Sequence, residues 1–79
     1  MNFEVDAEGY VPLGDVARGL LGMQCQYASH YVNGLGDLPR LADEFRFKNL
    51  DGASYHEIRI HQDDVEAFVQ RMRGLRSRS

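Results

Sequence analysis

The sequence predicts a single α+β domain in which two short helices are followed by a β-hairpin and a C-terminal helix. Apolar residues recur every three to four positions over residues 12–33, alternate with polar residues over residues 44–60, and return to the helical period over residues 61–74. A chain of 79 residues has room for one modest core and is too small for a substrate cleft with a lid. We therefore expect one domain, residues 11–74.

Residues 1–10 carry Phe3 and Val5 at alternating positions, together with acidic residues and a glycine. We expect them to form a partly ordered N-terminal arm, with a short edge strand as the alternative. The first helix is expected over Leu13–Leu21, because the apolar residues there form one stripe: Leu13, Val16, Ala17, Leu20 and Leu21. Pro12 suits the first helical position, and Gly22 suits the left-handed residue that ends a helix.

A second helix is expected over Gln24–Asn33, so close behind the first that the two must pack at a steep angle. Its apolar side would bury Cys25, Ala28 and Val32. Its other face would carry Gln24, Gln26, Ser29, His30 and Asn33. Tyr27 and Tyr31 share a face, and core packing is the favoured role for this pair, with base stacking as the alternative. Two helices joined by a tight turn are the arrangement from which helix-turn-helix DNA readers are built.

Residues 44–48 and 55–60 alternate apolar and polar side chains and are separated by a turn at residues 49–54, which predicts a β-hairpin. The core face of this hairpin would carry Phe45, Phe47, Ile58 and Ile60. The outer face would carry Arg46, Lys48, Glu57 and Arg59. Three positive charges then face one negative charge, so we expect a locally basic surface on an otherwise acidic domain.

The C-terminal helix is expected to begin within His61–Asp64 and to end at Gly74. Two aspartates lie in its first turn and two arginines in its last, where the helix dipole favours each charge. Its buried stripe would be Val65, Phe68, Val69 and Met72. Residues 75–79 would then form a basic tail.

Three motifs resemble those of excisionases and of the DNA-binding domains of MerR-like regulators, and they occur in the family's order. They are Val16-Ala17-Arg18-Gly19-Leu20-Leu21-Gly22, Gly36-Asp37-Leu38-Pro39 and Arg59-Ile60-His61-Gln62-Asp63-Asp64-Val65-Glu66-Ala67-Phe68. The resemblance covers roughly Val11 to Met72, and the Leu-Pro entry to the hairpin also resembles Cox-type phage regulators. It implies a winged helix-turn-helix in which the hairpin is the wing and the second helix is the recognition helix.

The sequence departs from this family where its members usually carry arginine or lysine. The matching positions are Cys25, Gln26, Ser29 and His30 in the recognition helix and Asp37 in the second motif. Glutamine and asparagine can still pair bidentately with adenine in a major groove. The DNA-binding candidates are therefore Gln24, Gln26, Tyr27, Ser29, His30, Asn33, Arg40, Arg46, Lys48 and Arg59. A solvated polar face that binds no DNA is the alternative interpretation.

The net charge of −3 argues against a polyanionic partner, but the charge is distributed unevenly. Residues 1–70 hold five of the nine Lys and Arg residues and all twelve Asp and Glu residues, whereas residues 71–79 hold four arginines. Few phosphate contacts are then available, so a single domain should bind DNA weakly. We expect copies on adjacent DNA sites to associate, acidic body against basic tail.

The sequence shows no pattern expected of an enzyme, a cofactor site or a metal site. No nucleophile, base and orienting residue come together, and the spacings of Cys25, His30, His56 and His61 match no zinc pattern. A single cysteine, no leader segment and no apolar run of bilayer length predict a cytoplasmic protein without a membrane partner.

Two functions remain open at this point. The first is a small sequence-specific protein that binds double-stranded DNA, either an excisionase-like recombination directionality factor with a recombinase or other protein partner, or a transcriptional regulator of a mobile element. The second is a non-enzymatic protein-interaction module, an inhibitor or an adaptor, that uses its acidic face.

Overall fold

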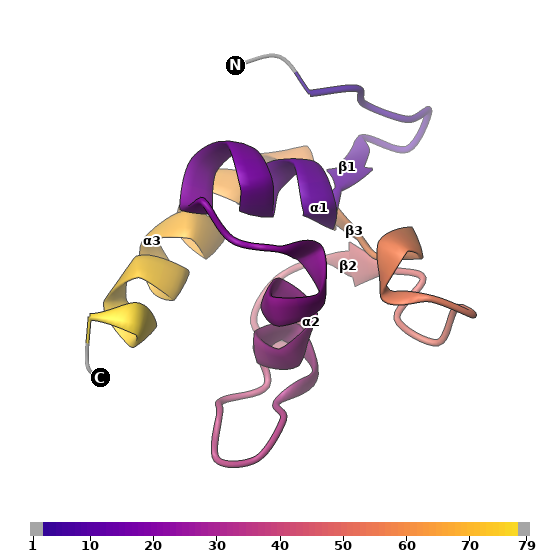
Figure 1. The fold of residues 1–79 in the computed structure, drawn as a ribbon. Coiled ribbons are helices and arrows are strands. Elements are labelled where there is room, and N and C mark those ends of the chain that lie inside the picture. Colours follow the sequence, from indigo (N-terminus) through magenta and orange to yellow (C-terminus); the bar gives the residue numbers. More distant parts are fainter. Residues whose placement is uncertain (1–2, 78–79) are drawn as a thin grey trace.

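The computed structural model describes residues 3–77, which form an α+β fold of three α-helices and a three-stranded antiparallel sheet (Figure 1). The order along the chain is β1, α1, α2, β2, β3, α3. Their bounds are Tyr10–Pro12 for β1, Leu13–Val16 for α1, Cys25–Asn33 for α2, Phe47–Lys48 for β2, Arg59–His61 for β3 and Val65–Arg76 for α3. No helix of residues 3–77 is both long enough and apolar enough to cross a lipid bilayer.

Strand β3 lies in the middle of the sheet. Its Ile60 stands opposite Val11 of β1 on one side and opposite Phe47 of β2 on the other, and both pairings are antiparallel. The β2–β3 pair confirms the predicted hairpin, but its strands are shorter than predicted. Residues Tyr55–Glu57 form a 3₁₀ turn instead of a strand, because the Ser54 hydroxyl accepts the His56 N–H at 3.2 Å and favours a local turn.

The first helix spans the predicted residues 13–21 but changes its hydrogen bonding halfway. After α1 the chain widens into a π-helical turn over Ala17–Leu21, and Gly22 ends it with the expected left-handed backbone, at φ 62°. Pro12 is the N-cap, one position earlier than predicted. Two arginines of α3 donate to the carbonyl groups at the end of this turn: Arg73 to Leu20 at 3.3 Å and Arg76 to Leu21 at 2.7 Å.

The hydrophobic core joins the helices to the inner face of the sheet. Its fully buried side chains include Leu13, Val16, Val32, Leu41, Ile60, Phe68 and Met72. The predicted core face of the hairpin is confirmed, since Ile58 and Ile60 are buried and Phe45 and Phe47 pack against the core half-buried. Both phenylalanine rings meet Phe68 edge-on, with ring centroids 6.0 and 5.7 Å away.

In the N-terminal arm, Phe3 packs against the core. The arm then turns at residues 6–9 and enters β1 at Tyr10–Pro12. The edge strand offered as the alternative for residues 1–10 is therefore displaced, because residues 3–5 form no strand and only Tyr10 of that segment belongs to β1. The Gln62 N–H donates to the Gly9 carbonyl at 2.8 Å and fastens the turn beside the sheet. The strand crosses the predicted boundary between arm and domain.

Helix α3 runs past Gly74, so the expectation that this glycine ends the helix is wrong. The reason is tertiary: Leu75 packs against the core, and Arg76 reaches the Leu21 carbonyl, so one more turn of helix is held in place. Of the predicted basic tail, Leu75 and Arg76 therefore belong to α3, and residues 78–79 lie outside the described residues.

Candidate nucleic-acid interface

Helix α2 presents one polar face to solvent. Gln26 and Asn33 on α2, and Gln24 directly before it, are exposed as predicted, and His30 is half-buried. Tyr27 lies on the same side of the helix with 58% of its surface exposed. The residues that share this face are therefore mostly amides and aromatic or imidazole rings, groups that read base edges and carry no fixed positive charge.

Ser29 does not belong to this face, and its prediction as an outward-facing residue is wrong. It is only 4% exposed, and its hydroxyl donates to the Gln26 carbonyl at 2.5 Å. Ser29 follows Cys25 by four residues and precedes Val32 by three, so helical geometry places it beside those two buried side chains. The bond to its own helix satisfies the hydroxyl there, and no DNA group can reach it in this conformation.

The two tyrosines of α2 have different environments. Tyr31 is half-buried and packs against the core, as expected, whereas the expectation of core packing is wrong for Tyr27. The Tyr27 ring stands edge-on to His30 and Tyr31, with centroid separations of 6.0 and 6.2 Å. These contacts orient an exposed aromatic ring next to the polar side chains of α2.

The beginning of α2 meets the connection between β2 and β3, residues 49–58. The Cys25 thiol donates to the Tyr55 carbonyl at 3.5 Å, and burial raises the pKa of this thiol, which keeps it protonated as the donor. A shallow cleft of about 210 Å³ lies at this contact and is lined by Arg18, Gln24, Cys25, Gln26, Tyr55 and His56. The structure thus adds Tyr55 and His56 to the predicted residues.

Arg46 was predicted to lie on the outer face of the hairpin as a DNA contact, and in the structure it forms a two-pronged ion pair with Asp64. Its Nε and Nη2 atoms lie 3.1 and 3.0 Å from the two carboxylate oxygens of Asp64. The Arg46 backbone N–H donates to the same carboxylate at 2.7 Å. These bonds from Arg46 lower the pKa of Asp64, and the pairing raises the pKa of the Arg46 guanidinium.

Lys48 and Arg59 meet carboxylates from the N-terminal arm. The Lys48 ammonium lies 2.5 Å from Asp6 Oδ2 and 2.6 Å from Glu8 Oε1, and Arg59 Nη1 lies 3.8 Å from the same Asp6 oxygen. Arg40, after the end of α2, pairs with Asp43 at 3.4 Å. Each of the four predicted basic contacts therefore has an acidic neighbour within the chain.

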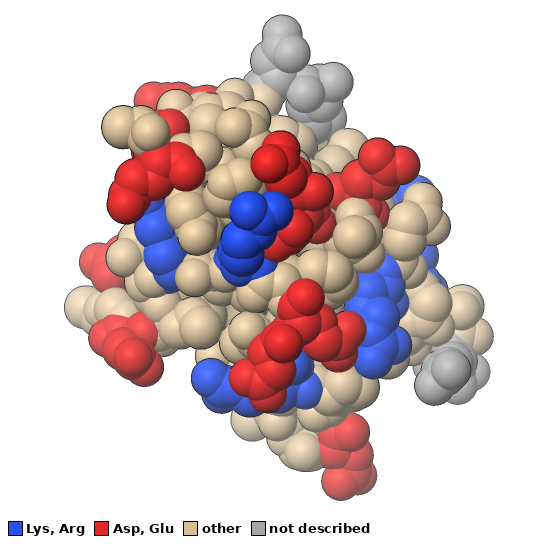
Figure 2. All heavy atoms as spheres, turned by 180° about the vertical axis from the view of Figure 1, so that it is seen from behind, with Lys and Arg blue, Asp and Glu red and all other residues tan. Residues whose placement is uncertain are grey.

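The expectation of a locally basic outer face is wrong for this reason. In Figure 2, which views the molecule from behind, basic and acidic side chains lie next to one another over the visible face and form no continuous basic patch. The pairing extends to Arg71 with Glu44 at 2.9 Å and to Arg18 with Asp15 at 3.0 Å. The acidic partners come from segments far away in sequence or from neighbouring turns, so composition alone could not assign them.

The ion pair of Asp6 should make the stability of the folded protein sensitive to acid. The Lys48 ammonium, followed by the Tyr10 N–H, lowers the pKa of Asp6 from 3.8 to about 2. An unfolded chain binds this proton more readily than the folded chain, so the contribution of Asp6 to stability is full above about pH 5 and is lost as the pH falls through 2. Thermal unfolding measured from pH 6 to pH 2 should therefore show a steep fall that is shallower in Asp6→Asn. Glu4→Gln is the control and should keep the wild-type slope; equal slopes for wild type and Asp6→Asn would contradict the pairing.

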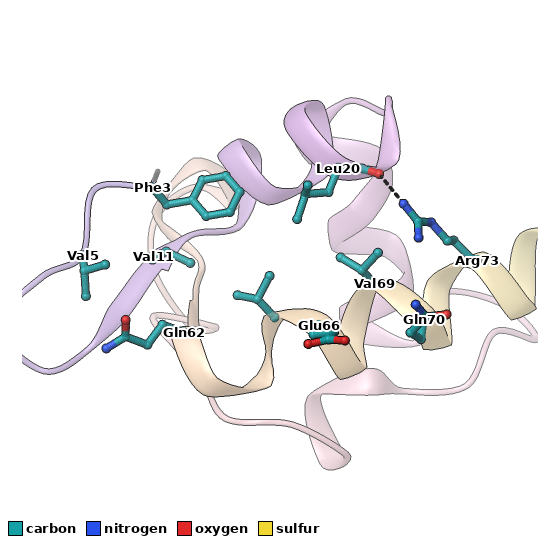
Figure 3. Close-up of a pocket in the computed structure, with 10 residues that line it drawn as sticks. Phe3, Val5, Val11, Leu20, Gln62, Glu66, Val69, Gln70 and Arg73 are labelled. Atoms are coloured by element: carbon teal, nitrogen blue, oxygen red, sulfur yellow. Dashed lines mark hydrogen bonds between the residues drawn. The ribbon is translucent and has the colours of Figure 1, made fainter. Parts of the chain in front are cut away.

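A separate groove of about 540 Å³ lies between the arm, the first helix and α3 (Figure 3). Phe3, Leu20 and Val69 line it with apolar groups, while Glu66 and Arg73 lie along α3. Among residues 3–77, no three His, Cys, Asp or Glu side chains gather closely enough to hold a metal ion, in this groove or elsewhere. The groove thus combines apolar side chains of the arm and the helices with charged side chains of α3.

Comparisons with protein-family models, with curated proteins and with solved structures found no match.

Proposed function

We propose that this protein is a small, non-enzymatic, sequence-specific double-stranded DNA-binding protein with a winged helix-turn-helix arrangement. In this proposal α2 is the recognition helix and the β2–β3 connection is the wing. The observation that supports it most directly is the contact of Cys25 with Tyr55, which fastens the wing to the beginning of α2. A helix that enters a major groove would then carry the wing to the neighbouring backbone as one unit.

The chemistry of the exposed groups supports direct reading of bases. Gln26 and Asn33 can each pair with the N6 and N7 atoms of adenine, and the Tyr27 ring can contact a thymine methyl group. Arg18 and His56, which both line the cleft, are suited to flanking phosphates. Because α2 itself contains neither Lys nor Arg, the dependence of affinity on salt should be shallow for a DNA-binding protein.

The motifs described above suggest a role for such a protein in a mobile element. We propose an excisionase-like recombination directionality factor or a transcriptional regulator that acts in the cytoplasm. Weak binding by one copy would be offset by association of copies on adjacent sites, or by a recombinase bound nearby.

The proposal is tested by selecting bound duplexes from a random pool and titrating the selected site with Gln26→Ala. Loss of a bidentate adenine contact should weaken binding by about 10- to 100-fold, or roughly 1–3 kcal/mol, and should relax the sequence preference at one position. Gln70→Ala, which removes an exposed glutamine from α3, is the matched control and should bind as the wild type does. If no duplex is bound even at low salt, the proposal fails.

A second function is favoured by the ion pairs. The cations at positions 18, 40, 46, 48 and 59 are paired, whereas Glu4, Asp37, Asp51 and Glu66 are exposed and form no ion pair within residues 3–77. A basic protein partner could pair with such exposed carboxylates, which would make the chain an inhibitor or an adaptor. Failure to bind DNA together with salt-sensitive binding to a basic protein would support this function over the first.

A further inference from the structure

The arm and the sheet bring two cations and two carboxylates together at the base of the wing. Lys48, at the end of β2, and Arg59, in β3, are cross-strand partners and share the outer face of the sheet. Only 25% of the Lys48 side chain and 33% of the Arg59 side chain are exposed. The Lys48 ammonium also lies over the Tyr10 ring, 4.8 Å from its centroid. This is a partly enclosed site for negatively charged oxygen atoms.

The carboxylates in that site are held by the turn that presents them. One oxygen of Asp6, Oδ1, accepts the N–H groups of Glu8 and Tyr10 at 2.9 and 3.0 Å. The other oxygen, Oδ2, points at Lys48 and Arg59, and Glu8 adds a second carboxylate to Lys48. A phosphodiester group also presents two negatively charged oxygens to Lys and Arg, so the arm supplies the same kind of partner that a DNA backbone would.

The arm is attached to the rest of the molecule less firmly than the sheet is. The backbone hydrogen bonds of residues 3–8 reach only Gly9 and Tyr10, the first residue of β1, and none joins these residues directly to β2, β3 or α3 within the described chain. Beyond these, the segment is held by the packing of Phe3 and by the ion pairs themselves. By contrast, Asp64, the partner of Arg46, stands at the start of α3 and cannot move without that helix. The arm can therefore leave its cations while the domain stays folded.

We propose that Lys48 and Arg59 form a site for a DNA backbone phosphate and that Asp6 and Glu8 occupy this site while the protein is free. Phosphate and arm then compete for the same cations, so the arm limits binding to any duplex, whatever its sequence. This inference rests on the proposed DNA-binding function. It also gives a role to the two cations that lie together on the outer face of the sheet.

The test compares the double variant Asp6→Asn and Glu8→Gln with the wild type. Asn at position 6 keeps an oxygen that can accept the two N–H groups of the turn, while both negative charges are removed. The matched control is Glu4→Gln with Glu66→Gln, which changes the net charge by the same amount at carboxylates that form no ion pair within residues 3–77. Affinity for one selected duplex is measured from 50 to 200 mM salt, with thermal unfolding to confirm that each variant is folded.

Without the two carboxylates, the Lys48 and Arg59 side chains are free to bind a phosphate. The arm variant should therefore bind the duplex more tightly than the wild type does at 50 mM salt. It should also steepen the slope of log affinity against log salt by about 1 to 2, which adds roughly a tenfold loss of affinity between 50 and 200 mM. Adding Lys48→Ala to the arm variant should remove most of this gain. If arm variant and control bind alike while the wild type binds, this inference is overturned and the proposed function stands. If no form of the protein binds any duplex, the proposed function and this inference both fail.

Discussion

Phe68→Ala is expected to lower the free energy of unfolding by about 3–5 kcal/mol, the cost of truncating a fully buried phenylalanine. Phe68 has no exposed surface and joins α3 to β2 and to the segment before it through edge-on contacts with Phe47 and Phe45. Because a domain of this size has only a few kcal/mol of stability, much of the population should be unfolded at 25 °C. Urea denaturation followed by circular dichroism measures the loss.

Gln70→Ala is the control for that change. Gln70 lies two positions further along α3 and is exposed, so its truncation should alter the free energy of unfolding by no more than about 0.5 kcal/mol. A loss below about 1 kcal/mol for Phe68→Ala would contradict the packing of the three phenylalanine rings described above.

Gly34→Ala is expected to lower the free energy of unfolding by about 3 kcal/mol, for two additive reasons. Gly34 ends α2 with φ +69°, a left-handed conformation that costs an L residue about 1–2 kcal/mol. An added Cβ would also stand 2.9 Å from the Cβ and 3.1 Å from the Cα of Arg40, so the backbone of the following segment would have to move. Urea denaturation again provides the measurement.

Gly22→Ala separates the two reasons. Gly22 ends the first helix with φ +62°, but an added Cβ there meets no atom within 4 Å. This variant should therefore lose only the conformational part, about 1–2 kcal/mol. If both variants lose the same amount, Gly34 does not pack closely against Arg40 as the structure shows.

Hydrophobic periodicity predicted the helices well, since each is amphipathic and two end at left-handed glycines. The first helix occupies the expected residues, α2 begins one residue later than expected, and β2 and β3 pair as a hairpin. Gly74 shows the limit of this reasoning. A glycine at this position predicted the end of the helix, but the contacts of Leu75 and Arg76 with other elements keep the following residues helical.

The candidate site was predicted less well, because its character depends on neighbours that are distant in sequence. Strand β1, the first helix and α2 all lie between Asp6 and Lys48 along the chain, so no local sequence pattern links the two residues. Ser29 is different, since its spacing from Cys25 and Val32 already placed it on the buried side of α2. His56 was not predicted as a site residue, because the sequence pattern indicated a strand where the structure has a 3₁₀ turn. This turn brings the β2–β3 connection onto α2.

The sheet order β1-β3-β2 has a consequence for how the chain acquires its structure during synthesis. Strand β1 pairs with β3, whose Ile60 lies opposite Val11. The first strand therefore leaves the ribosome long before the strand with which it forms hydrogen bonds has been made. The packing of α1 against α2, by contrast, involves only residues 13–33 and is available to the chain before β3 is made. Closure of the sheet should then be the slow event for a nascent chain, and a ribosome-bound chain that ends before β3 should leave Tyr10–Pro12 open to proteolysis.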